Sequence, residues 1–138
     1  MGEAVRNWPQ TLSKTAYRKK LTWDQAKEFC NERESFLAVI NSEEENNLVH
    51  EIATKAFAPE KRYLFWIGLR KCGSSWKWVD GAKANYTKWS LRQPDNYKNN
   101  EECVHMYVRI GESSKWTDRH WNDHHCSHKA YFVCQNYF

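Results

Sequence analysis

The stretch LFWIGL, residues 64–69, marks the point at which the character of this 138-residue chain changes. From here on the sequence consists of short runs rich in aromatic and β-branched residues, separated by Gly, Asn, Asp and Pro, a pattern typical of strands. The clearest predicted strands are LFWIGL itself, WKWVD at 76–80, CVHMYV at 103–108 and YFVCQ at 131–135. Residues 84–102 and 111–128 lack the pattern and are predicted to be irregular loops.

Two helices are predicted before this point. Thr22 followed by Gln25 is a capping-box pattern, and apolar residues then recur at helical spacing through about Arg33. Ser42 with Glu45 repeats the signal at the start of a second helix, whose apolar stripe is Leu48, Val49, Ile52, Ala53 and Ala56 and which ends before Pro59. Helices followed by strands predict an α+β fold.

The length and composition limit the class of protein. The chain has the size of one domain, residues 1–138, and contains no apolar run near the roughly 20 residues that a membrane span needs. Its net charge of +4 is spread along the sequence without a block of like charges, so we expect no nucleic acid partner. The first residues do not form a signal or transit peptide, so we expect a mature or trimmed form.

Five cysteines in a chain of this length indicate an oxidising compartment, so we expect a secreted or extracellular domain. Their spacing gives neither a C-x-x-C redox pair nor paired zinc knuckles, which favours disulfides. Five cysteines cannot all pair within one chain, so at least one is free or joins another molecule. The spacing alone does not say which.

The loop at 84–102 contains Gln93, Pro94 and Asp95, and a cis bond before Pro94 would hold the two flanking side-chain oxygens on the same side. Each of these residue types is also a common loop former. Oxygen-bearing side chains converge here if Cys103 and Cys126 are joined, and the candidate metal ligands are then Gln93, Asp95, Glu101, Asn122 and Asp123. Hard oxygen donors of this kind suit Ca²⁺.

Four features together resemble the C-type lectin domain family: WIGL at 66–69, QPD at 93–95, WND at 121–123, and the framework cysteines Cys30, Cys103, Cys126 and Cys134. The resemblance runs from about Leu21 to Phe138. It implies a fold with two helices, two small antiparallel sheets and long calcium-binding loops, and the disulfide pairs Cys30–Cys134 and Cys103–Cys126. Cys72 is then left over, either as a free thiol or as a bridge in a homodimer.

The resemblance also implies a function. Family members with Gln-Pro-Asp prefer galactose or N-acetylgalactosamine, so we expect calcium-dependent binding of galactose-type glycans on glycoproteins or cell surfaces. The implied sugar-binding residues are Gln93, Asp95, Tyr97, Glu101, Asn122 and Asp123, with Tyr97 stacking on the sugar. The basic segment RKCGSSWK at 70–77 lacks acids for a second ion, so one principal calcium site is expected. Trp121 is expected in the core.

Other functions fit less well. No nucleophile lies beside a base and no glycine-rich phosphate loop is present, so we predict no enzymatic activity. The main alternative is a module of the same family that recognises a protein partner through the same loops, and a remoter one is ice binding.

Four histidines lie around the last motif: His120, His124, His125 and His128. They are interpreted as exposed loop residues, although His124 and His128 could hold zinc and His120 could contact a sugar substituent. A further expectation is that protonation of His120, His124 or His125 near pH 6 loosens a neighbouring Ca²⁺.

Overall fold

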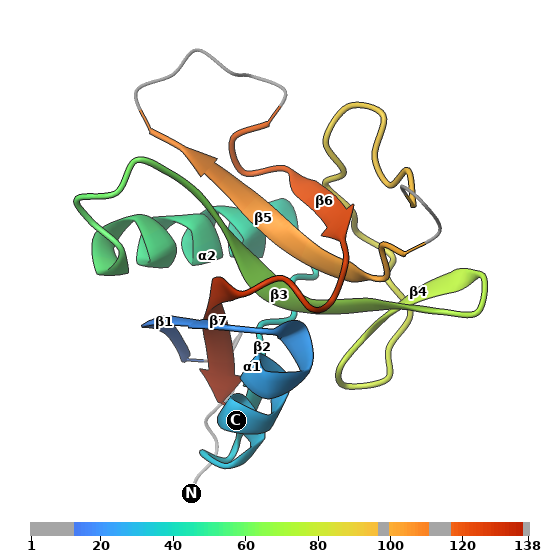
Figure 1. Ribbon diagram of the computed structural model, residues 1–138, viewed down its shortest axis with the longest axis horizontal. Coiled ribbons are helices and arrows are strands. Elements are labelled where there is room, and N and C mark those ends of the chain that lie inside the picture. Colours follow the sequence, from blue (N-terminus) through green and yellow to red (C-terminus); the bar gives the residue numbers. More distant parts are fainter. Residues whose placement is uncertain (1–12, 97–99, 111–116, 137–138) are drawn as a thin grey trace, which may run out of the picture.

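The computed structural model describes residues 13–96, 100–110 and 117–136. Its elements, in chain order, are β1 (Lys14–Leu21), α1 (Trp23–Asn31), β2 (Ser35–Leu37), α2 (Glu43–Ala56), β3 (Arg62–Cys72), β4 (Ser75–Trp78), β5 (Cys103–Arg109), β6 (Trp121–His124) and β7 (Ala130–Asn136) (Figure 1). Neither helix is long and apolar enough to cross a membrane. Both helices and the α+β class agree with the sequence prediction.

The ends of the helices follow from their caps. At α1 the Thr22 hydroxyl accepts a hydrogen bond from Gln25 N at 3.2 Å, and Gln25 Oε1 accepts one from Thr22 N at 3.1 Å, which completes the capping box. At α2 the Ser42 hydroxyl accepts from Glu45 N at 3.1 Å. These bonds satisfy amide groups that no helical partner reaches, so the helices begin where the sequence predicts.

The strands form one mixed sheet with the order β1-β7-β3-β5-β6, while β2 adds to β7 and β4 to β3. This corrects the expectation of two separate antiparallel sheets. The strand pairs are antiparallel except that β3 runs parallel to β7, at Phe65 opposite Tyr131 and Trp66 opposite Phe132. β3 is 11 residues long and pairs with β7, β5 and β4. It therefore joins the β1-β7 side of the sheet to the β5-β6 side.

Two buried clusters fill the protein on either side of β3. One lies between the sheet and α2 and includes Phe65, Ile67 and Trp121. The other includes Trp66 and Trp23, beside the disulfide that ties α1 to β7. Figure 1 shows α2 along the side of β3 and β5, and α1 near β1 and β7.

Both disulfides implied by the family resemblance are present. Cys30 pairs with Cys134, and Cys103 pairs with Cys126. The second pair joins the start of β5 to the residues just after β6, which fixes the end of the molecule that carries the long loops. Cys72 is free and exposed, and a bridge from it to a second chain stays a prediction.

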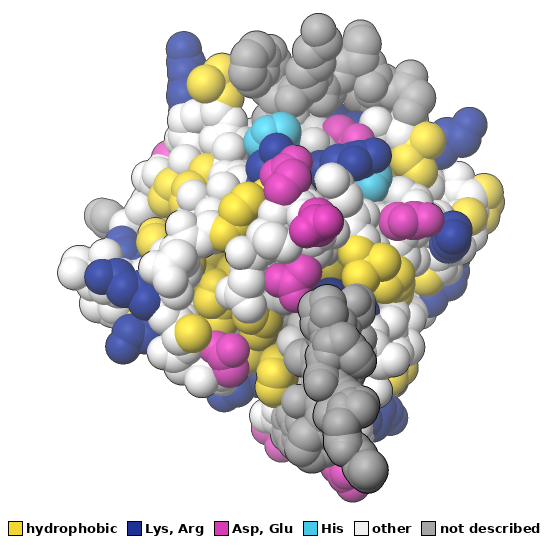
Figure 2. All heavy atoms as spheres, turned by 180° about the vertical axis from the view of Figure 1, so that it is seen from behind, with side chains coloured by type: hydrophobic (Ala, Val, Ile, Leu, Met, Phe, Trp, Pro, Cys, Tyr) yellow, Lys and Arg dark blue, Asp and Glu magenta, His cyan; other side chains and the backbone are white. Residues whose placement is uncertain are grey.

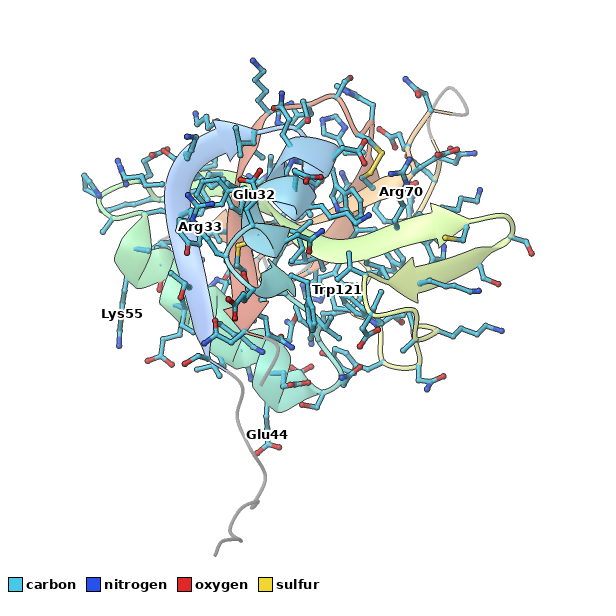
Figure 3. The ribbon with its side chains drawn as sticks, turned by 90° about the horizontal axis from the view of Figure 1, so that it is seen from below. Glu32, Arg33, Glu44, Lys55, Arg70 and Trp121 are labelled. Carbon is cyan, nitrogen blue, oxygen red and sulfur yellow. A yellow bond between two sulfur atoms is a disulfide. The ribbon has the colours of Figure 1, made fainter. Side chains whose placement is uncertain are left out.

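Trp121, labelled in Figure 3, is fully buried and contacts three segments of the chain. Its indole N–H donates to Asn46 Oδ1 in α2 at 2.8 Å, while its backbone N donates to Lys88 O at 2.7 Å and its carbonyl accepts from Ser90 N at 2.8 Å. The rings of Trp78, Tyr86 and Trp89 pack around it. The predicted core role of Trp121 is confirmed.

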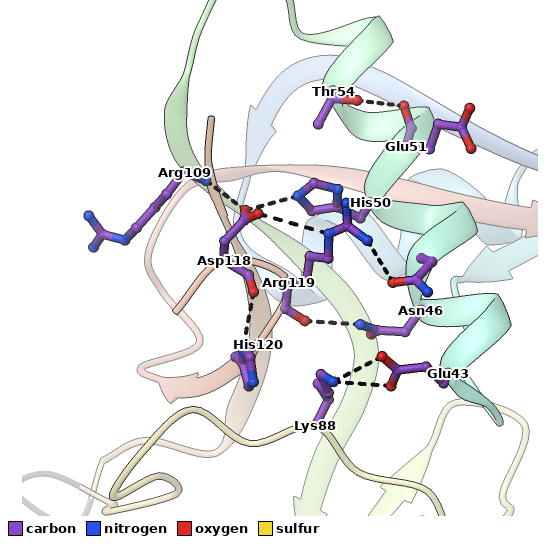
Figure 4. Close-up of polar contacts among 11 residues, drawn as sticks. Glu43, Asn46, His50, Glu51, Thr54, Lys88, Arg109, Asp118, Arg119 and His120 are labelled. Carbon is purple, nitrogen blue, oxygen red and sulfur yellow. Dashed lines mark hydrogen bonds and ion pairs between the residues drawn. The ribbon is translucent and has the colours of Figure 1, made fainter. Parts of the chain in front are cut away.

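A polar network continues this attachment of α2 (Figure 4). Asn46 Nδ2 donates to Arg119 O at 3.0 Å, and His50 Nε2 lies 2.9 Å from Asp118 Oδ1. Asp118 Oδ1 also accepts from Arg109 N at 2.9 Å. The residues before β6 are therefore fixed to both α2 and β5.

The surface is mixed in charge on the face seen in Figure 2, where Lys and Arg side chains are interspersed with Asp and Glu. This agrees with the spread of charge along the sequence.

Gly68 tests the packing of the WIGL motif. A Cβ at this position would lie 2.6 Å from Leu37 O and 3.1 Å from Ala38 O, both backbone atoms that cannot move aside alone. We therefore predict that Gly68→Ala lowers the free energy of unfolding by about 1–3 kcal/mol or more, measured by denaturant unfolding.

The matched control is Gly73→Asn. Gly73 has φ +64° but no atom within 4 Å of an added Cβ, and asparagine tolerates this conformation. The free energy of unfolding of Gly73→Asn should therefore stay close to that of the wild type. Equal free energies of unfolding for Gly68→Ala and the wild type would contradict the close approach of Gly68 to the carbonyl oxygens of Leu37 and Ala38.

Candidate calcium site

The long loop between β4 and β5 is held against β6 by backbone contacts. Trp89 forms an isolated parallel bridge with Trp121, and the two hydrogen bonds of the Trp121 main chain to Lys88 and Ser90 secure this point. Gln93 N then donates to Ser90 O at 2.9 Å, which turns the chain toward the end of the sheet. Residues 88–90 of the predicted irregular loop are thus held by the backbone of the WND motif.

The bond between Gln93 and Pro94 is cis, the arrangement that the sequence analysis considered for this motif. The residue on each side of the Gln-Pro-Asp motif has a positive φ: Arg92 at 67° and Asn96 at 48°. Asparagine is among the residues that adopt this region most readily, so Asn96 suits the sharp turn that follows Asp95.

The carboxylate of Asp123 ties this turn to β6. It accepts one hydrogen bond from Asp95 N at 3.2 Å and another from Asn96 N at 2.7 Å. Asn96 Oδ1 in turn accepts from Glu101 N at 3.2 Å, so the start and the end of the loop are joined. The sequence did not indicate this bridging role of Asn96, which depends on the return of the chain to Glu101.

Three carboxylates meet at this point. One oxygen from each of Asp95, Glu101 and Asp123 lies within 4.8 Å of the others. Asp123 is fully buried, and its pKa is raised because burial disfavours the charged form, with repulsion from Asp95 adding to the effect. The hydrogen bonds from the backbone of Asn96 and Asp95 oppose this rise. Such a group of acids is stabilised when a cation neutralises it.

The unpaired state of Gln93 Oε1 points most directly to a ligand. This oxygen is buried and has no hydrogen-bond partner, although buried acceptors in proteins are almost always paired. It belongs to the residue two positions before Asp95. Amide and carboxylate oxygens are hard donors of the kind that Ca²⁺ prefers.

Of the two remaining predicted site residues, the structure describes Asn122 but not Tyr97. Asn122 lies beside Asp123 in β6, opposite His105 of β5, and is partly buried. Tyr97 lies outside the described residues, so its predicted stacking role stays a prediction. The structure therefore brings Asp95, Glu101 and Asp123 together. In the sequence, Gln93 lies two residues before Asp95 and Asn122 directly precedes Asp123.

The histidines of the last motif are partly buried, which corrects the expectation of exposed loop residues. His124 Nδ1 lies 3.4 Å from Glu101 Oε2, so one histidine does contact a candidate calcium ligand. Burial, together with repulsion from His125 and His128, lowers the pKa of His124 to about 4. Protonation of His124 therefore belongs near pH 4, and the expected switch near pH 6 is wrong for this ring.

His105 was not singled out in the sequence. It is fully buried in β5, neither ring nitrogen has a hydrogen-bond partner, and its ring packs between Trp66 and His124. Burial, with repulsion from the neighbouring histidines, holds its pKa well below 6.5, so the ring is neutral in the folded protein. Only the strand pairing reveals it, because the sequence places it inside an ordinary apolar run.

The described part of the long loop is held against a mixed sheet, and the acidic cluster of Asp95, Glu101 and Asp123 lies where the two meet. The profile of the lectin C-type domain matches residues 19–136. The chain belongs to the C-type lectin domain family, whose members generally bind Ca²⁺.

Individual relatives agree with this assignment. The chain is 34% identical over 125 residues to asialoglycoprotein receptor 2 of Mus musculus, which covers 86% of this chain and 36% of the receptor. It is 30% identical to the hepatic lectin of Gallus gallus, over 97% of this chain and 60% of that protein. It is 36% identical to salivary C-type lectin 1 of Aedes albopictus, over 82% of this chain and 74% of that one. The chain thus spans only part of the length of the two vertebrate relatives.

Solved structures show the same fold. The carbohydrate-recognition domain of the mouse scavenger receptor C-type lectin superposes with a TM-score of 0.73 at 28% identity, over 95% of this chain and 91% of that domain. A calcium-dependent type II antifreeze protein superposes with a TM-score of 0.72 at 30% identity, over 89% of this chain and 90% of that one. The fold therefore serves more than one kind of ligand.

The buried histidines predict a loss of stability in acid. The pKa values of His50, His105, His124 and His128 are all lowered, so below about pH 6.5 the unfolded chain binds more protons than the folded one. The free energy of unfolding should then fall as the pH drops from about 6.5 toward 4. Denaturant unfolding in the presence of a chelator measures this without a contribution from metal release.

The variant His105→Phe keeps a ring of similar size in the same pocket and removes one of these titrating groups. It should lose less stability than the wild type between pH 7 and pH 5. Identical pH profiles for the two proteins would contradict the assignment of a neutral, buried His105.

Proposed function

We propose that this domain binds galactose- or N-acetylgalactosamine-terminated glycans in a calcium-dependent manner. The residues proposed to hold the ion are Gln93, Asp95, Glu101, Asn122 and Asp123, and the same residues with Tyr97 are proposed to contact the sugar. The observation that carries the proposal is the unpartnered, buried Gln93 Oε1 beside the cis bond that leads to Asp95. We further propose that the domain acts outside the cell, as a binding module and not as an enzyme.

The chemistry of the donor set supports a polyhydroxylated ligand. A bound Ca²⁺ takes about 6–8 oxygens, so five side chains leave positions that two vicinal sugar hydroxyls can fill. The carboxylates of Asp95 and Glu101 accept hydrogen bonds from such hydroxyls, while the amide NH₂ of Gln93 donates one. The order of amide and acid around Pro94 therefore determines which arrangement of hydroxyls is preferred.

The relatives favour a glycan of the galactose type without deciding it. One is named as a receptor for asialoglycoproteins and another as a hepatic lectin, which fits a sugar ligand. Selectins and antifreeze proteins are also similar to this chain, so ligands differ within the family. The reason to choose galactose is the Gln-Pro-Asp order at residues 93–95, which the family resemblance associates with galactose-type sugars.

The sharpest test exchanges the two ligand types. The double variant Gln93→Glu with Asp95→Asn keeps one acid and one amide, and so the charge of the site, but reverses the donor and acceptor pattern. We expect the wild type to bind immobilised galactose in calcium and to lose binding in chelator. The double variant should bind galactose at least several-fold more weakly and gain binding to mannose.

Calcium binding of the double variant, measured by calorimetry, serves as the control and should persist. An unchanged ranking of galactose and mannose with calcium still bound would contradict the sugar assignment. Calcium binding without retention on any sugar would instead favour the alternative in which the loops recognise a protein partner.

A further inference from the structure

Three histidines at the end of β6 form a second cluster of possible metal ligands. One ring nitrogen from each of His124, His125 and His128 lies within 4.8 Å of the others. The ring centroids of His124 and His125 are 4.2 Å apart, those of His124 and His128 are 4.7 Å apart, and those of His125 and His128 are 5.8 Å apart. Three imidazoles thus face one small volume at the protein surface.

The backbone holds this arrangement in place. His124 is the last residue of β6 and pairs with Cys103 of β5. Cys126, two residues later, is bonded to the same Cys103, and the chain then turns so that His128 N donates to His125 O at 3.3 Å. A strand end, a disulfide and a turn therefore fix the three histidines within five residues. A flexible surface run of histidines would have none of these restraints.

The protonation of the rings suits metal binding. Neutral imidazole, not imidazolium, is the form that coordinates a metal. The three rings are partly buried, and burial favours the neutral form of an imidazole over its charged form.

The surroundings of the rings resemble those of bound metal sites. Histidines in such sites commonly give one nitrogen to the metal and bond the other to a carboxylate or another polar group. His124 Nδ1 lies 3.4 Å from Glu101 Oε2, and His125 Nδ1 lies 3.1 Å from Ser127 Oγ. Behind His124 lies the fully buried ring of His105, 5.1 Å away, with both nitrogens unpartnered. This wall gives the cluster a buried side and leaves the opposite side accessible.

We propose that His124, His125 and His128 bind a divalent transition metal ion, with Zn²⁺ the expected occupant. Three nitrogen donors suit zinc, copper or nickel and do not suit calcium, which prefers oxygen. With Zn–N bonds of about 2.1 Å, tetrahedral ligands lie about 3.4 Å apart, so the rings need to close by on the order of an ångström. Three protein ligands leave the fourth position for water or for an oxygen of an external ligand. The site uses none of the proposed calcium ligands and stands independently of the proposed function.

The test measures zinc binding to the whole chain at neutral pH in excess calcium, so that the acidic cluster does not compete for zinc. A Cys72→Ser background removes the exposed thiol, which could otherwise bind zinc. Calorimetry should show one Zn²⁺ per chain. His124→Gln and His128→Gln should each weaken zinc binding by at least about tenfold, since each removes one of three ligands, and Co²⁺ should give the visible bands of a four-coordinate ion only when all three histidines are present.

The matched control is His120→Gln. His120 lies in the same segment and is partly buried, but its Nδ1 is 2.9 Å from Asp118 O and it is not a member of the cluster. Its zinc affinity should equal that of the background protein. The proposal is overturned if the background protein binds no stoichiometric zinc, or if His120→Gln weakens binding as much as His124→Gln does. Circular dichroism of each variant, without metal, shows that a loss of binding does not arise from a loss of fold.

Discussion

The buried carboxylate of Asp123 is the constraint on which the site depends. It accepts backbone hydrogen bonds from Asp95 and Asn96, which lie 28 and 27 residues away in the sequence, and so fixes the tip of the long loop to β6. Hydrogen bonds to a charged acceptor are stronger than those between neutral groups, and these two are partly buried. Without them the described part of the loop would be attached to β6 mainly through Lys88 and Ser90, which bond to the backbone of Trp121.

The same carboxylate is also part of the acidic cluster. Its pKa is raised by burial and by Asp95, which shows that the charge needed to hold the loop is itself unfavourable in this position. A cation bound by Asp95, Glu101 and Asp123 would remove that conflict, so we expect the conformation of the loop and the binding of the ion to be thermodynamically linked. His124 Nδ1 lies 3.4 Å from Glu101 Oε2, so the histidine cluster adjoins the acidic cluster without sharing a ligand with it.

The parts of the structure that the sequence predicts are those determined by local interactions. Both helices begin at residues whose side chains cap them, whereas proline only makes a cis bond possible before Pro94 and the surrounding fold selects it. β6 was missed because Trp-Asn-Asp-His has no strand pattern, and it is a strand only because β5 lies beside it. β1 was missed because its basic residues hide the alternation, and its pairing with β7 is a tertiary contact.

The site was predictable only in part, for the same reason. The acids at 95, 101 and 123 were recognised as possible ligands from their types and from the family resemblance, and the structure brings them together. The bridging role of Asn96 depends on a positive φ and on the return of the chain to Glu101. The histidine cluster depends on a turn and a disulfide, so spacing alone suggested His124 and His128 but not His125. The unpartnered nitrogens of His105 became visible only once β5 and β6 were paired.

If Asp123 joins the loop and the ion in one site, calcium perturbs the two together. Backbone amide resonances of the ¹⁵N-labelled protein, followed during a calcium titration, measure this. The account predicts one saturable set of shifts at Asp95, Asn96, Glu101 and Asp123, with the amides of α1 unchanged, and the same shifts at about tenfold or more higher calcium in Asp123→Asn. An absence of shifts in the loop, or a titration unaffected by Asp123→Asn, would contradict it.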